Sequence, residues 1–144
     1  MNKIKALNGL IITFILAITI SCSNTDDNES SNYELTYAIS VEHPSEGIVG
    51  ETLNIIVSFR VMNGCGEFGR FIERGDGLTK TIEIEAKYEG LICTMDLPIR
   101  QIKYEFTPNI AGVYVYRFKS GPDFRFGESG QDEYLTVKVL VKEE

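Results

Sequence analysis

Few residues of this 144-residue chain could perform catalysis or hold a metal ion. His43 is the only histidine, and it precedes Pro44 in a turn, so any Ser–His–Asp or Cys–His arrangement would depend on a surface residue. No glycine-rich phosphate loop and no HExxH or EF-hand spacing is present. Glu83 and Glu85 share one strand face, where we expect them to be solvated. We therefore predict a protein that is not an enzyme, with no catalytic residue, metal site or cofactor. The alternative is a hydrolytic or metal-dependent enzyme that uses acidic loop residues.

Cys22 stands at the end of a segment with the layout of a secretory signal. Lys3 and Lys5 give a basic start, an apolar run extends from Leu10 to Ile20, and the small residue Ser21 precedes the cysteine. The run is too short for a membrane-spanning helix, which needs about 20 apolar residues. The sequence therefore predicts an exported protein.

With a cysteine at the cleavage point, this segment resembles the signal of bacterial lipoproteins, which is cut before an acylated cysteine. Thr19 departs from the usual pattern, which prefers Leu three residues before the cysteine. The acidic stretch 23–29 resembles the export signal of some Bacteroidota surface lipoproteins. The resemblance implies a signal peptide at 1–21, lipidation at Cys22 and an outer-membrane lipoprotein at the cell surface. If the acidic stretch is only a solvated linker, the lipoprotein could instead lie on the periplasmic face of the membrane.

Acylation of Cys22 would leave two further cysteines, Cys65 and Cys93. In an oxidising compartment an even remainder favours a disulfide between them. Two buried free thiols are the alternative. A zinc site fits less well, because the chain has one histidine and no CxxC pair.

The mature chain would be strongly acidic. Loss of Lys3 and Lys5 lowers the basic count from 14 to 12 against 21 acidic residues, which gives a net charge of −9. Such a charge disfavours nucleic acid and anionic lipid as partners, although simple solubility also accounts for charges spread this evenly. We expect no nucleic-acid partner.

The segment 120–132 is long for a hairpin connection. Phe124, Arg125 and Phe126 lie among acidic residues there, and exposed aromatics beside a cation would form a contact patch for a protein or glycan. The acidic side chains could instead bind Ca²⁺. In the third interpretation the two phenylalanines only lengthen the hairpin.

The elements that must position these residues are strands, because apolar residues alternate with polar ones along most of the chain. In the first segment the apolar set is Tyr33, Leu35, Tyr37, Ile39 and Val41. Turn chemistry separates the segments, and no helical period follows the signal. The predicted strands cover 33–42, 51–62, 68–74, 79–88, 99–107, 113–119 and 133–141. We predict a flexible acidic tether at 22–32 and an antiparallel β-sandwich of about seven strands at 33–144.

The stretch from Phe106 to Tyr114 resembles the corner before the sixth strand of immunoglobulin-like domains, where a tyrosine bonds back to the turn. Tyr114 would be that tyrosine. Tyr116 takes the place of the second cysteine and the chain has no Trp, which favours an immunoglobulin-like or fibronectin-like sandwich rather than an antibody-type domain. From Tyr33 onward the chain also resembles small lipoproteins of Bacteroidota type, through Asn63-Gly64-Cys65-Gly66 and Tyr88-Glu89-Gly90 with Cys93-Thr94. That resemblance implies no activity.

Up-and-down strand order would gather the three connections near residues 65, 93 and 126 at one pole, where the tether also begins. The two cysteines would then meet. We expect a membrane-anchored, non-enzymatic binding or structural module of the cell envelope, held through its lipid, with a protein or glycan as the possible ligand.

Overall fold

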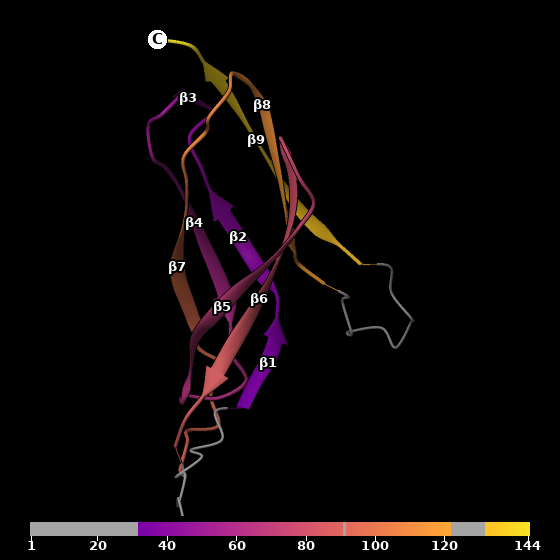
Figure 1. Ribbon diagram of the computed structural model, residues 1–144. Helices are drawn as coiled ribbons and strands as arrows, with labels where there is room; N and C mark the ends of the chain where they lie inside the picture. Colours follow the sequence, from indigo (N-terminus) through magenta and orange to yellow (C-terminus); the bar gives the residue numbers. More distant parts are fainter. Residues whose placement is uncertain (1–31, 91, 122–131) are drawn as a thin grey trace, which may run out of the picture. The chain divides into compact units, whose positions relative to one another are not determined.

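The strands of the sandwich follow the alternating segments of the sequence. The computed structural model describes residues 32–90, 92–121 and 132–144 (Figure 1). Its strands are β1 (Asn32–Thr36), β2 (Ala38–Glu42), β3 (Glu46–Ile48), β4 (Leu53–Arg60), β5 (Gly66–Arg74), β6 (Thr79–Tyr88), β7 (Ile99–Phe106), β8 (Gly112–Lys119) and β9 (Tyr134–Lys142). Within these residues no helix is long and apolar enough to cross a membrane.

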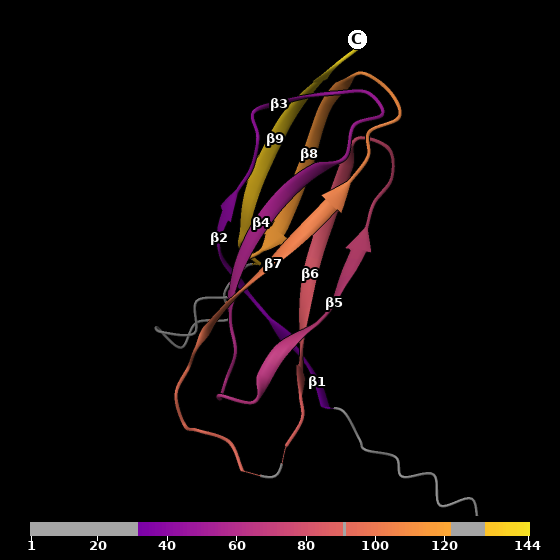
Figure 2. The same ribbon diagram turned by 90° about the vertical axis from the view of Figure 1, so that its left-hand side faces the viewer.

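Two sheets face each other, as Figure 2 shows. The smaller sheet has the order β2-β4-β7. In the larger sheet β6 pairs with β5 along one edge, and its other edge is shared end to end by β1 and β8. The sheet continues through β9 to β3. The predicted all-β sandwich of two sheets is therefore confirmed.

The core is made of the inward-facing residues of both sheets. Alternation predicted the buried face correctly in β4, β6, β8 and β9. The fully buried side chains include Ile55, Val57, Phe59, Ile82, Ile84, Phe118, Val137, Val139 and Val141. Tyr104 from β7 packs edge-on against Phe71, Tyr116 and Phe118, so an aromatic cluster fills the space between the sheets.

The first predicted strand is divided at Tyr37, and its predicted inward face is wrong. β1 joins the larger sheet and β2 the smaller one. Thr36 and Ala38 are buried on either side of the switch, while Leu35 and Ile39 are exposed. Thr36 donates its hydroxyl hydrogen to the carbonyl of Arg60, which accounts for a polar side chain at this buried position.

Two pairings are parallel rather than antiparallel, namely β6 with β8 and β3 with β9. β6 and β8 run in the same direction because one strand, β7, separates them in the chain and lies in the other sheet. β3 has only three residues and was not among the predicted strands. It overlaps a Pro-Ser-Glu-Gly turn signal at residues 44–47, and its partner β9 is about 90 residues away.

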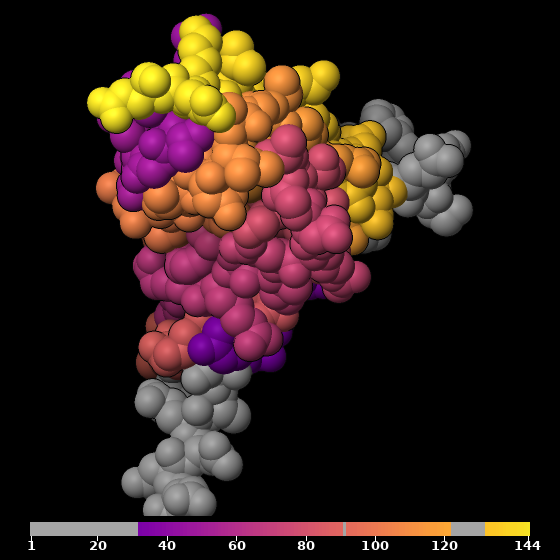
Figure 3. Space-filling view, turned by 45° about the horizontal axis from the view of Figure 1, so that its top comes forward, coloured from indigo at the N-terminus to yellow at the C-terminus, as the bar shows by residue number. Residues whose placement is uncertain are grey.

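The connection before β8 contains the hydrogen bond expected of a tyrosine corner. The Tyr114 hydroxyl donates to the carbonyl of Ile110 over 3.1 Å. This connection lies at the end of the sandwich that also holds the C-terminus, seen from above in Figure 3. A shallow depression there is lined by Val49, Asn109, Ile110, Ala111, Glu143 and Glu144.

Candidate functional site: a disulfide-braced pole

At the opposite end of the sandwich, the β4–β5 and β6–β7 connections are joined by the Cys65–Cys93 disulfide. The S–S distance is 2.08 Å and the Cα atoms are 5.4 Å apart. The structure thus contains the disulfide that the cysteine count predicted. We call the residues 61–66, 89–90 and 92–98 the disulfide pole.

Backbone contacts hold the two connections together around this disulfide. The Gly64 amide donates to the carbonyl of Thr94 over 3.1 Å, and the Val61 amide donates to that of Pro98 over 3.1 Å. The Tyr88 hydroxyl accepts from the Met62 amide at 2.9 Å. These bonds satisfy backbone groups that irregular loops usually leave to water, so the pole is a built structure rather than two loose loops.

Arg100, at the start of β7, bonds to the β4–β5 connection of the pole. Its guanidinium donates to the carbonyl of Gly66 over 3.1 Å and to that of Gly64 over 3.2 Å. It also forms an ion pair with Glu67 at 3.1 Å. Sequence reasoning missed Arg100, because no local pattern distinguishes it from any other cation on a strand.

Two glycines allow the close approach of the connections. A Cβ at Gly64 would lie 1.9 Å from the Thr94 hydroxyl oxygen, where no side-chain atom fits unless the threonine moves. Gly90 has a φ of +123°, and a Cβ there would lie 3.1 Å from the sulfur of Cys65. Both positions therefore need glycine for reasons of space, and Gly90 also for its backbone conformation.

The tip of the pole, residues 92–97, exposes large apolar side chains with the polar Thr94 and Asp96 among them. Ile92 is 94% exposed and Met95 is 97% exposed. Met62, Leu97 and Ile99 are more than half exposed around them. Scattered exposed apolar residues are ordinary. Four of these residues belong to the pole and Ile99 adjoins it, so several large exposed apolar side chains lie at this end of the domain.

The first strand of the sandwich begins at this same pole. Asn32 pairs with Tyr88, the last residue of β6, so the chain enters the sandwich next to the disulfide-linked connections (Figures 1 and 2). Cys22, the predicted lipidation site, lies outside the described residues. The predicted tether of about ten residues would join Cys22 to the pole.

The described ends of the connection after β8 lie away from the disulfide pole, where the prediction had placed this connection. Phe118 pairs with Ile82, so β8 ends partway along β6, roughly 20 Å from the end of β6 at Tyr88. The physical reason is stagger, since β1 occupies the rest of that edge of β6. Phe124, Arg125 and Phe126 lie outside the described residues.

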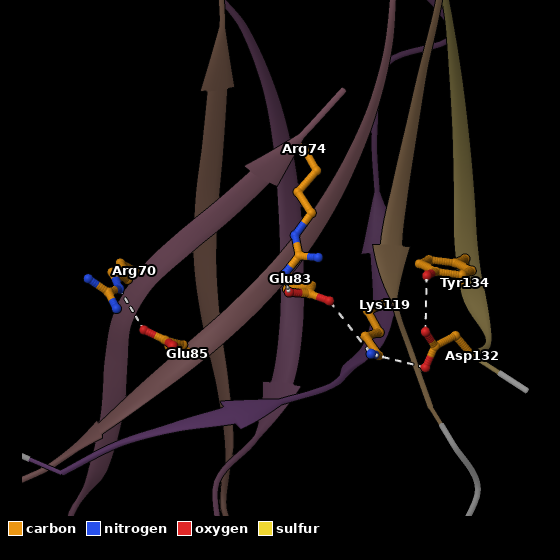
Figure 4. Close-up of polar contacts among 7 residues, drawn as sticks. All are labelled: Arg70, Arg74, Glu83, Glu85, Lys119, Asp132 and Tyr134. Atoms are coloured by element: carbon orange, nitrogen blue, oxygen red, sulfur yellow. Dashed lines mark hydrogen bonds and ion pairs between the residues drawn. The ribbon is translucent and has the colours of Figure 1, made fainter. Parts of the chain in front are cut away.

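The two ends of this connection are tied to the larger sheet by charge. The ammonium of Lys119 lies 3.0 Å from a carboxylate oxygen of Asp132 and 3.6 Å from one of Glu83 (Figure 4). The hydrogen bond to Asp132 raises the pKa of Lys119 above its usual value. The cation is therefore the junction between the loop ends and β6.

Glu83 is not solvated as expected. It is 8% exposed, and besides Lys119 it pairs with Arg74 at 3.1 Å. Glu85 pairs with Arg70 at 2.5 Å. Each of these carboxylates thus faces a cation on the outer face of the larger sheet, which gives it a structural partner (Figure 4).

His43 and the remaining acidic residues form no cluster in the described part of the chain. His43 is exposed, and its Nδ1 donates to the carbonyl of Pro44 over 2.9 Å. Over residues 32–90, 92–121 and 132–144 no group of three His, Cys, Asp or Glu side chains could hold a metal ion. The proposed calcium ligands fall mostly between 122 and 131, outside these ranges.

Comparison with known proteins gives one family. The model of the ORF11 beta-sandwich domain matches residues 55–127, about half of the chain, from within β4 to the segment after β8. No curated protein and no solved structure matches the chain. The matched segment includes both cysteines of the disulfide and Tyr114. The chain therefore belongs to the ORF11 β-sandwich domain family.

Proposed function

We propose that this protein is a lipoprotein of the outer membrane, anchored through acylated Cys22, whose sandwich is a non-enzymatic binding or structural module of the cell envelope. The Cys65–Cys93 disulfide carries the proposal. Disulfides of this kind belong to oxidising compartments, which supports export. The pairing also leaves Cys22 as the one cysteine available for acylation.

The binding role rests on the connection 120–132. Its ends are fixed to β6 through Lys119, Glu83 and Asp132, which lowers the ordering cost of any contact made there. They lie away from the start of β1, so a ligand at this connection would not compete with the tethered end. We propose Phe124, Arg125 and Phe126 as the residues that contact a protein or glycan, with the domain at the cell surface.

The ion pairs support a binding or structural role over a hydrolytic one. A carboxylate that acts as general acid or base needs access to a substrate. Glu83 and Glu85 are instead held beside Arg74, Lys119 and Arg70. These ion pairs give both carboxylates structural partners within the domain.

Mass spectrometry of the native protein tests the anchor. We expect a mature chain that starts at Cys22 and carries acyl chains, and a Cys22→Ser variant that no longer fractionates with membranes. A Cys93→Ser variant is the matched control, because it removes a cysteine but leaves the anchor. An unmodified Cys22 in a chain that retains Met1 would refute the lipoprotein assignment.

Replacement of Phe124, Arg125 and Phe126 by alanine tests the contact patch. We expect lost binding to envelope protein or glycan with an unchanged melting temperature. A large fall in melting temperature would instead assign the two phenylalanines to the core and end the patch hypothesis.

A further inference from the structure

We propose that the disulfide pole inserts its apolar tip into the interface of the bilayer that carries the lipid anchor, so that the domain holds the membrane at two points. The inference rests on the proposed anchoring at Cys22 and adds a partner for a surface that the anchor does not explain. The partner is a lipid surface, and the contacting residues are Ile92, Met95 and Leu97.

The first support is exposure without a structural role. Ile92 and Met95 are almost wholly exposed, and neither belongs to the core cluster. Large apolar side chains in water are unfavourable, and the interface of a bilayer would remove that surface from water. Interfacial binding of this kind grows with the buried apolar area.

The second support is rigidity. The disulfide at Cys93 and the hydrogen bond from the Gly64 amide to the Thr94 carbonyl fix the middle of the segment that carries the tip. Arg100, which follows this segment, bonds to the carbonyls of Gly64 and Gly66 in the other connection. A braced tip loses little conformational entropy when it enters another phase, so more of its apolar transfer energy remains for binding.

The third support is the position of the chain entry. Asn32 lies beside Tyr88, and Tyr88 accepts the hydrogen bond from Met62 of the pole. About ten residues separate Cys22 from Asn32, a span of at most roughly 35 Å. A lipid on Cys22 would therefore keep the pole near the bilayer at high effective concentration, so that even a weak contact would be populated.

The charge of the protein indicates which lipid headgroups the tip would contact. Glu89 pairs with Lys87, and Asp96 accepts a hydrogen bond from Thr94 and lies against Gly64. These carboxylates have partners within the domain, and Asp96 is exposed between Met95 and Leu97. The mature chain remains acidic at −9, so we expect contact with a neutral, zwitterionic surface rather than an anionic one.

The absence of tryptophan from the sequence gives a direct test. Met95→Trp creates a single fluorescent reporter at a position that is 97% exposed, so the fold should tolerate it. Ile110→Trp is the matched control, because Ile110 is 54% exposed at the opposite end of the sandwich. Both acylated proteins are reconstituted into phosphatidylcholine vesicles with and without brominated acyl chains.

We expect the emission of Met95→Trp to shift to shorter wavelength in vesicles and to be quenched by brominated lipid at least about twofold more than that of Ile110→Trp. Leu97→Trp, a second reporter at the tip, should behave like Met95→Trp. Each variant is also analysed by mass spectrometry for acylation, and its flotation with the vesicles is measured.

The outcomes separate the two proposals. Acylated protein that floats with vesicles while both tip reporters remain unquenched would overturn tip insertion and leave the anchor standing. Equal quenching at 95 and 110 would also overturn it, because the domain would then lie flat. Protein that is not acylated and does not float would refute the anchor, and the inference that rests on it would fall too.

Discussion

Arg100 joins three groups at the disulfide pole through one guanidinium. Its partners are two backbone carbonyls and the carboxylate of Glu67. Arg100→Met should lower the free energy of unfolding by about 1.5–3 kcal/mol, the usual range for hydrogen bonds to a charged group. Chemical denaturation measures this loss. Lys103→Met on the same strand is the control, since its half-exposed pair with Glu105 should contribute no more than about 1 kcal/mol. Equal losses of unfolding free energy in the two variants would show that the Arg100 contacts do not stabilise the pole.

Gly90 is a second residue whose type is set by the pole. Gly90→Ala places a side chain at φ +123° and against the sulfur of Cys65. We expect a loss of about 2–3 kcal/mol in the free energy of unfolding, from backbone strain and crowding together. Gly77→Ala is the matched control. Gly77 has a φ of +55° and open space around it, so the substitution should cost only about 1 kcal/mol. A smaller loss at Gly90 than at Gly77 would contradict the crowding.

At the scale of elements, the disulfide between the two connections of the pole contributes to the stability of the fold. The cysteines are 28 residues apart. In the chain-entropy model, a cross-link over a loop of this size lowers the entropy of the unfolded chain and so stabilises the fold by about 3–4 kcal/mol. Replacing both Cys65 and Cys93 with Ser should lower the free energy of unfolding by that amount. Wild-type protein unfolded under reducing conditions should show the same loss. Two thiols that titrate in non-reduced, denatured protein would overturn the pairing.

The sequence predicted every strand that has alternating residues. From Leu53 onward, each segment with alternating apolar residues is a strand, and in β4, β6, β8 and β9 the alternating apolar residues form the buried face. Strand alternation is a local signal, and it was sufficient wherever one face of a strand packs on the core along its whole length. The disulfide was also predicted, on the expectation that acylation of Cys22 leaves Cys65 and Cys93 as a pair in an oxidising compartment.

Pairings that depend on distant parts of the chain were not predictable. The switch at Tyr37 moves the chain from one sheet to the other, so burial falls on Thr36 and Ala38, which alternation had placed outside. β3 exists because of its parallel partner β9. The stagger of β8 against β6, which separates the end of β8 from the pole, depends on β1 occupying the rest of the edge. None of these three features, the switch at Tyr37, strand β3 and the stagger of β8, can be predicted from a local sequence pattern.

For the whole molecule, the buried tyrosines predict the response to alkali. Burial between the sheets raises the pKa of Tyr104 and Tyr116 above the ordinary value of 10.0, and the charge of Glu73 raises both further. The unfolded chain therefore releases these protons at lower pH than the folded one. Their contribution to stability is complete below pH 10 and is lost as pH rises toward the folded-state pKa values.

We expect the free energy of unfolding to fall steeply above about pH 10. The double variant Tyr104→Phe, Tyr116→Phe keeps the rings but cannot ionise, so its fall should be shallower. Denaturation at a series of pH values measures both slopes. Parallel slopes in the double variant and the wild type would refute the assignment.

The chain enters the sandwich at one end and its C-terminus lies at the other (Figure 1). A force that drew the domain away from an anchored Cys22 would therefore act along β1. The five residue pairs that join β1 to β6 would be loaded in shear, because their hydrogen bonds lie across the direction of pull. They would have to rupture together rather than peel apart one by one. The topology thus gives the attachment point a mechanical resistance that its short strand length alone would not suggest.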